Sequence, residues 1–109
     1  MGQIEIDDYL HEKLNELTYL LYQKKYFSYL DSAIKYVSGI YTHIRNPDNY
    51  RTLNPCKIDK YGQYYIKYKP TRSTTQYYIT YDIVDGIYYV QDIFSDKSTE
   101  YARYIKGTK

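Results

Sequence analysis

Apolar side chains recur with a helical period over the first 45 residues. Between about residues 8 and 24 a stripe with steps of four, three and four is formed by Leu10, Leu14, Leu17 and Leu21. This spacing predicts a helix with one buried face. A second apolar face predicts a helix that ends at about residue 45, before Pro47. Ser28 followed by Asp31 resembles a capping box for its start, and the short connection predicts an antiparallel hairpin.

Other segments alternate with a period of two, which is typical of strands. The segment "QIEI" (3–6) predicts a short strand before the first helix. From Gly62 onward, alternation predicts strands over about 64–69, 76–83 and 87–94, with the turn "VDG" before the third. Residues 46–60 contain two Asn-Pro pairs and no period, and we expect a loop there. The end of the chain predicts a short helix capped by Ser98 or Thr99 and ended by Gly107.

These elements predict an α+β fold and a single domain over residues 1–109. We expect an N-terminal strand and a two-helix hairpin packed on an antiparallel β-sheet, with the first strand at one edge and a short C-terminal helix. The face that the helices should cover bears Tyr64, Ile66, Tyr68, Tyr77, Ile79 and Tyr81. The opposite face then bears Tyr65, Lys67, Lys69, Gln76, Tyr78, Tyr89 and Gln91. Function should lie on this second face.

Charge and composition narrow the possible partners. The first 50 residues carry five Lys/Arg against seven Asp/Glu, and the remaining residues carry ten against six. A polyanion would therefore meet the second half of the chain. Nineteen tyrosines and no tryptophan make Tyr the main large core residue.

Few residues are available for metal or redox chemistry. With Cys56 as the single cysteine, and only His11 and His43 beside it, no spacing is typical of a zinc site. We therefore expect no metal and no cofactor. The opening residues lack the basic-then-apolar pattern of a signal peptide, and no long apolar run is present, which predicts a cytoplasmic protein without a membrane span.

Two lysines on one strand give the clearest chemical signal. Side chains at positions i and i+2 lie about 6.5 to 7 Å apart on one face, close to the spacing of adjacent phosphates in a single strand, and Lys67 and Lys69 have this relation. Arg72 follows at the turn, and Tyr65 and Tyr78 offer flat surfaces for stacking bases. The alternative is that these lysines only keep an exposed sheet face soluble.

Three segments together resemble the RelE/ParE toxin superfamily of type II toxin-antitoxin systems. They are "YFSYLDSAIKYVSGIYTHI", "YGQYYIKYKPTRSTTQYYITYDI" and "DIFSDKSTEYARYI", and the resemblance covers nearly the whole chain. It implies a metal-independent endonuclease that cleaves messenger RNA in the ribosomal A site. The catalytic residues that it implies are Lys67 and Lys69 on the phosphate, Arg72 as a further cation, and Tyr101 near the scissile bond. The exposed sheet face adds Tyr65, Tyr78, Tyr89 and Gln91 as candidates to contact RNA or a partner, and the segment after it adds Lys97.

One segment departs from that pattern and leaves alternatives open. Many similar chains end the last strand with "NNH", or carry Arg or His there, whereas this chain reads "FSDKS" at 94–98. A histidine for acid-base chemistry is absent from this segment, although Lys97 could supply a cation. The leading hypothesis is an mRNA-cleaving toxin whose cognate antitoxin crosses the Lys67, Lys69 and Arg72 face. The alternatives are a ParE-like poison of DNA gyrase and a catalytically degenerate toxin-fold binding protein.

The role of the C-terminal helix is also open at this level. Residues 101–107, "YARYIKG", could form a mobile helix that a partner displaces. They could equally form a packed lid that buries Tyr101 and Tyr104, which are three residues apart on one helix face.

Overall fold

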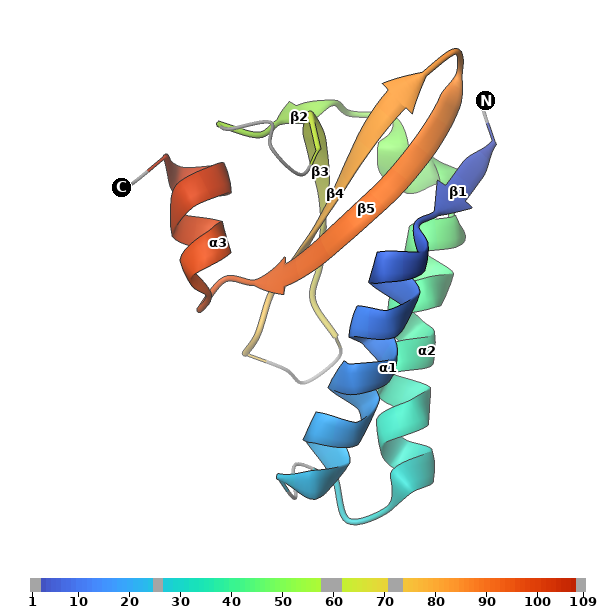
Figure 1. The fold of residues 1–109 in the computed structure, drawn as a ribbon, viewed down its shortest axis with the longest axis vertical. Helices are drawn as coiled ribbons and strands as arrows, with labels where there is room; N and C mark the ends of the chain where they lie inside the picture. Colours follow the sequence, from blue (N-terminus) through green and yellow to red (C-terminus); the bar gives the residue numbers. More distant parts are fainter. Residues whose placement is uncertain (1–2, 25–26, 58–61, 71–73, 108–109) are drawn as a thin grey trace.

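A five-stranded sheet lies between a long helical hairpin and a short C-terminal helix (Figure 1). The computed structural model describes residues 3–24, 27–57, 62–70 and 74–107. In chain order the described elements are β1 (Ile4–Ile6), α1 (Asp8–Gln23), α2 (Leu30–Arg45), the 3₁₀-helix η1 (Pro47–Tyr50), β2 (Asn54–Pro55), β3 (Tyr64–Tyr68), β4 (Tyr77–Val84), β5 (Ile87–Ser95), α3 (Thr99–Tyr101) and the π-helix η2 (Ala102–Lys106). The α+β class predicted from the sequence is confirmed.

The strand order within the described residues is β1-β5-β4-β3-β2. Strands β3, β4 and β5 form the expected antiparallel meander. Strand β1 joins the β5 edge, as expected, but runs parallel to β5, with Ile4 opposite Tyr88 and Ile6 opposite Val90. The sheet is therefore mixed rather than wholly antiparallel, because the helical hairpin carries the chain away from β1 before the meander begins.

The described part of the predicted loop, residues 46–57, contains two short elements. The Asn46 side chain accepts a hydrogen bond from Asp48 N at 3.1 Å and caps η1. Residues Asn54 and Pro55 then pair with β3 at the second edge of the sheet. A two-residue strand has no period to detect, and an edge position tolerates the missing N–H of proline. The loop prediction was wrong for these two short elements.

Helix α1 matches its predicted range, and the Asp7 side chain accepts a hydrogen bond from Tyr9 N at 2.8 Å at its start. Helix α2 begins at Leu30, later than the predicted cap. Its N-cap residue is Tyr29, which makes no side-chain capping bond. The proposed capping box of Ser28 and Asp31 was therefore wrong, because Ser28 lies one residue before the position from which a cap could reach the open amides.

The hairpin packs on one sheet face, which we call the inner face, and encloses the main core. Its buried residues are Leu10, Leu14, Val37, Ile40, Ile44, Tyr50, Ile66, Tyr77, Ile79, Tyr81, Val90 and Ile93. The sheet residues predicted to face the helices all lie in or against this cluster. The connecting end of the hairpin extends beyond the sheet (Figure 1).

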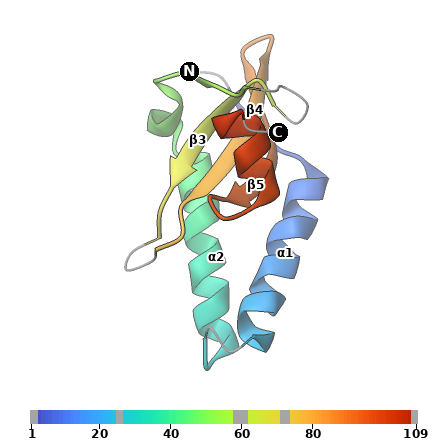
Figure 2. The same ribbon diagram turned by 90° about the vertical axis from the view of Figure 1, so that its left-hand side faces the viewer.

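The C-terminal helix crosses the opposite face, which we call the outer face (Figure 2). A second, smaller cluster forms there from Tyr78, Phe94 and Tyr104, with Tyr65, Tyr101 and Ile105 packed against it. The predicted ends of this helix are confirmed, since Ser98 caps α3 and Gly107 adopts φ 77°. In this structure the segment is packed on the sheet, with Tyr104 buried and Tyr101 partly buried.

Within the described ranges, no helix combines the length and the apolar character that crossing a membrane requires.

Candidate nucleic-acid interface

A row of three side chains crosses the outer face near the lower end of the sheet. In the β3–β4 register Lys67 lies opposite Tyr78, and in the β4–β5 register Tyr78 lies opposite Phe94. Lys67 is exposed, whereas Tyr78 and Phe94 are buried beneath the C-terminal helix. A cation therefore lies beside an aromatic surface, about 5 Å away across the strands.

Polar groups lie one row further toward the ends of these strands. Strands β3 and β4 are paired as far as the opposed residues Tyr68 and Tyr77, and the exposed Lys69 and the partly buried Gln76 are the next residues beyond that pair. Asp96 N donates to Gln76 O at 2.9 Å, which brings Asp96 to the same row. The lower end of the outer face thus bears Lys67 and, just beyond the paired strands, the backbone-linked residues Gln76 and Asp96, with Lys69 two residues after Lys67.

Tyr101 reaches this end of the face from α3. Its ring centroid lies 4.8 Å from that of Tyr78, and the two hydroxyl groups share a hydrogen bond. The Tyr65 ring lies 5.4 Å from Tyr78 on the other side. The structure therefore brings Lys67 together with three of the tyrosines predicted for the site.

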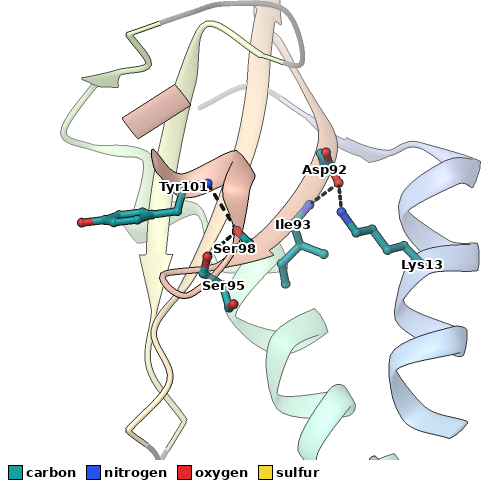
Figure 3. Close-up of polar contacts among 6 residues, drawn as sticks. All are labelled: Lys13, Asp92, Ile93, Ser95, Ser98 and Tyr101. Carbon is teal, nitrogen blue, oxygen red and sulfur yellow. Dashed lines mark hydrogen bonds and ion pairs between the residues drawn. The ribbon is translucent and has the colours of Figure 1, made fainter. Parts of the chain in front are cut away.

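The first turn of α3 is fastened to the end of β5, which holds Tyr101 in place. The Ser98 hydroxyl donates to Ser95 O at 2.6 Å and accepts from Tyr101 N at 3.2 Å (Figure 3). Figure 3 shows the Tyr101 side chain directed away from the Lys13 side of the strand. This anchoring fixes the ring without a long helix.

Tyr78 is a neutral group at physiological pH. Burial, followed by its hydrogen bond to Tyr101 and by the nearby Tyr101, Tyr65 and Asp96 charges, raises the pKa of Tyr78 to about 12. Its hydroxyl can therefore hold a proton in the tyrosine pair but cannot act as a base at pH 7. Because Tyr78 is only 7% exposed, the aromatic surface open to a base belongs to Tyr65 and Tyr101.

Two of the predicted contact residues lie elsewhere on the outer face. Gln91 is the extra residue of a β-bulge, since Thr80 pairs with Asp92 and Tyr81 with Val90. Its amide donates to the Asp82 carboxylate at 2.6 Å.

Tyr89 lies directly opposite Asp82. The structure therefore groups Tyr89 and Gln91 around a carboxylate, four residues along β4 from Tyr78 and apart from the lysines.

The remaining predicted site residues have different outcomes. Lys97 is exposed in the turn after β5, where its N–H donates to the Ser95 hydroxyl at 3.3 Å. Arg72 lies outside the described residues. His43 and His11 belong to the helices, as predicted, and contact Tyr68 and Tyr41 respectively.

Burial lowers the pKa of His43, partly offset by the Lys67 backbone. No cluster of three or more His, Cys, Asp or Glu side chains suited to a metal occurs in the described part of the chain.

Sequence reasoning missed an apolar groove between the far end of α1 and the ends of β4 and β5. It has a volume of about 860 Å³, and its apolar lining includes Leu17, Leu20, Leu21, Phe27, Tyr36 and Ile93. Beside it, Lys13 forms an ion pair at 2.6 Å with the buried Asp92 (Figure 3). The one sequence signal for this groove is the length of the leucine stripe, because its last residues, Leu17 and Leu21, line the groove.

Comparisons of the chain with protein-family models, with curated proteins and with solved structures find no match. Any function assigned to the chain therefore rests on its own side chains and on their arrangement.

Proposed function

We propose that this chain is the toxin of a type II toxin-antitoxin pair of the RelE/ParE kind, a metal-independent endonuclease that cleaves ribosome-bound messenger RNA and is neutralised by a cognate antitoxin. The observation that supports this most is the cluster at the lower end of the outer face. There the exposed Lys67 lies opposite Tyr78, whose ring contacts those of Tyr65 and Tyr101, and the exposed Lys69 follows two residues later. Sequence-tolerant binding to single-stranded RNA uses two components, cations that contact the phosphates and aromatic rings that stack on the bases.

The same residues suit phosphoryl chemistry. When a ribose 2′-hydroxyl attacks the adjacent phosphate, negative charge develops on the phosphoryl oxygens, and fixed cations stabilise it. Lys67 and Lys69 would supply these cations, with Arg72 as a third. The Tyr101 hydroxyl, held beside the neutral Tyr78, would lie near the scissile bond as a proton donor.

The proposed partner covers this face. An antitoxin segment that carries acidic residues would pair with Lys67 and Lys69, would block the RNA site, and would bind more weakly as salt is raised. The same segment would cross the Tyr101 ring, which is partly exposed on that face.

Substitution of the lysines tests the proposal. Induced expression followed by primer extension on translated messages should show cleavage by the wild-type chain. Lys67→Ala and Lys69→Ala should each reduce cleavage roughly tenfold to a thousandfold. The thermal midpoint should stay nearly unchanged, because exposed charges contribute little to stability.

A matched control is Lys35→Ala, which removes an exposed lysine from α2 and should leave cleavage intact. Tyr101→Phe separates the hydroxyl from the ring. Equal cleavage by the Lys67, Lys69 and Lys35 variants would remove the cluster from the mechanism and leave the lysines with a role in solubility only.

A second candidate is supported by the exposed apolar side chains of the hairpin. Tyr19, Leu20 and Ile34 are 58%, 48% and 48% exposed near its connecting end, a surface suited to binding a protein. This favours a ParE-like gyrase poison or a degenerate toxin-fold binding protein. If the wild-type chain cuts no translated RNA but inhibits gyrase supercoiling in vitro, this second assignment replaces the first.

A further inference from the structure

Asp96 lies at the edge of the cationic cluster and had no role in the sequence-based site. It directly follows β5, and its N–H continues the β4–β5 ladder by donating to Gln76 O at 2.9 Å. Strand alternation then directs its side chain to the outer face, on the side of Phe94 and Tyr78. The negative charge of Asp96 is close enough to contribute to the raised pKa of Tyr78.

The carboxylate of Asp96 is held in an unfavourable state. Its Oδ1 atom is buried and accepts no hydrogen bond from the part of the chain that the structure describes, while the residue as a whole is partly exposed. A buried carboxylate oxygen without a partner is costly, and such groups in native structures call for an explanation. Stability does not provide one, because an amide or an apolar side chain would fill the space at a lower cost.

The proposed cleavage reaction needs a proton acceptor, and a carboxylate can serve as one. Lys67 and Lys69 are cations, and Tyr78 is protonated at neutral pH. None of these three side chains readily removes a proton from a ribose hydroxyl at pH 7. Among the described side chains that the registers bring to this end of the outer face, Asp96 is the anion.

We propose that Asp96 is the proton acceptor for RNA cleavage, a role that rests on the ribonuclease function proposed above. The carboxylate takes the proton of the ribose 2′-hydroxyl as the 2′-oxygen forms a bond to the adjacent phosphorus. The bond from phosphorus to the 5′-oxygen of the next nucleotide breaks, and that oxygen receives a proton from the Tyr101 hydroxyl. The products are a 2′,3′-cyclic phosphate and a free 5′-hydroxyl, and exchange with solvent restores both side chains.

This role predicts opposite effects of one substitution on activity and on stability. Asp96→Asn keeps the size of the side chain and removes the proton acceptor, so cleavage of translated RNA should fall about 10²- to 10⁴-fold. The thermal midpoint should stay the same or rise, because a charge that lacked a buried partner has been removed. A structural role predicts instead that the midpoint falls together with the activity.

A matched control is Asp85→Asn in the β4–β5 turn. Asp85 is exposed with φ 52°, a conformation that Asn tolerates well, and the change in net charge is the same. This variant should cleave at the wild-type rate. Binding of an RNA with a 2′-deoxynucleotide at the cleavage position should be similar for the wild type and Asp96→Asn.

The outcomes separate the two proposals. If the wild type cleaves and Asp96→Asn cleaves equally fast, or loses activity together with a lower midpoint, the role of Asp96 is overturned and the ribonuclease function stands. If the wild type cleaves no RNA in translating extracts, the ribonuclease function is overturned, and the role of Asp96 with it. Loss of cleavage at an unchanged or raised midpoint, with the Asp85 variant active, supports both.

Discussion

The two faces of the sheet are covered by very different amounts of structure. The inner face packs against two helices of 16 residues each, and its central residues Ile79 and Tyr81 are fully buried. The outer face packs against one helix of about two turns, and Lys67 on the neighbouring strand stays exposed. The inner face therefore supplies most of the hydrophobic stabilisation, and the outer face keeps charged groups available to a ligand.

Tyrosine serves both faces but with different hydroxyl environments. On the inner side, the Tyr50 hydroxyl donates to Ile44 O at 2.6 Å, and Tyr36 donates to the Tyr77 hydroxyl at 3.2 Å. The Tyr81 hydroxyl, in contrast, is buried and has no hydrogen-bond partner among the described residues. On the outer side Tyr78 shares a hydrogen bond with Tyr101. The Tyr81 ring is instead held by its packing against Tyr50, Tyr64 and Tyr88.

The largest expected effect is on the inner face. Ile79 is fully buried and lies between Ile66 and Ile93 in the strand registers. Ile79→Ala should lower the free energy of unfolding by about 2 to 5 kcal/mol, measured by urea denaturation. Val84→Ala at the exposed end of the same strand is the control and should change it by less than about 0.5 kcal/mol. Similar values for both variants would mean that the inner face is not the main core.

An intermediate effect is expected from the outer cluster. Tyr104 packs against Phe94 at a ring-centroid distance of 6.1 Å, and Tyr104→Ala should open the C-terminal helix locally. Because local opening limits the loss, we expect about 1 to 2 kcal/mol. Hydrogen exchange should accelerate at the amides of residues 99–106 and not in α1, whereas Arg103→Ala, at an exposed position, should leave exchange unchanged. Equal acceleration in both helices would indicate that the two faces unfold together.

The smallest expected effect is that of removing one tyrosine hydroxyl, and its effect on the free energy of unfolding should differ between the two faces. Tyr78→Phe removes a shared hydrogen bond and should lower the free energy of unfolding by about 1 kcal/mol. Tyr81→Phe removes a hydroxyl that has no partner among the described residues, and its effect should be neutral or stabilising. Denaturation of both variants under identical conditions measures the difference. A loss of the same size in both would show that the Tyr81 hydroxyl is also paired.

The same two variants should change the response to alkaline pH. Burial is the main cause that raises the pKa of both Tyr78 and Tyr81 from 10.0 to about 12. The unfolded chain therefore loses these protons at lower pH than the folded chain. The contribution of each protonated hydroxyl to the free energy of unfolding is therefore complete below pH 10 and is lost between about pH 10 and 12. Each Phe variant lacks one of these hydroxyls, so its free energy of unfolding should fall less than that of the wild type over this range of pH.

Much of the fold could be predicted because period and face are local properties. The leucine stripe and the alternation around Ile66 and Ile79 located α1, the meander and the inner face. The capping box at Ser28 failed because the side-chain types that form a cap also occur freely outside helices. Strand β2 was missed because it depends on pairing with β3 rather than on its own two residues.

The candidate site was only partly predictable for a related reason. Alternation placed Lys67 and Tyr78 on one face, and the register brings them side by side. It also placed Gln91 on that face, but a bulge and a bond to Asp82 separate Gln91 from the lysines. The sequence offered no reason to assign Asp96 a role, because the burial of its Oδ1 atom depends on tertiary packing.

The sequence by itself determined which residues share a face, since the periods of 3.6 and 2 follow from the backbone geometry of each element. Tertiary structure decided what covers each face. The parallel placement of β1, the burial of Tyr78 by the C-terminal helix and the position of Asp96 beside Gln76 all join segments that are distant in the chain. Such contacts depend on which arrangement buries the most apolar surface while keeping polar groups paired, and no single segment carries that information.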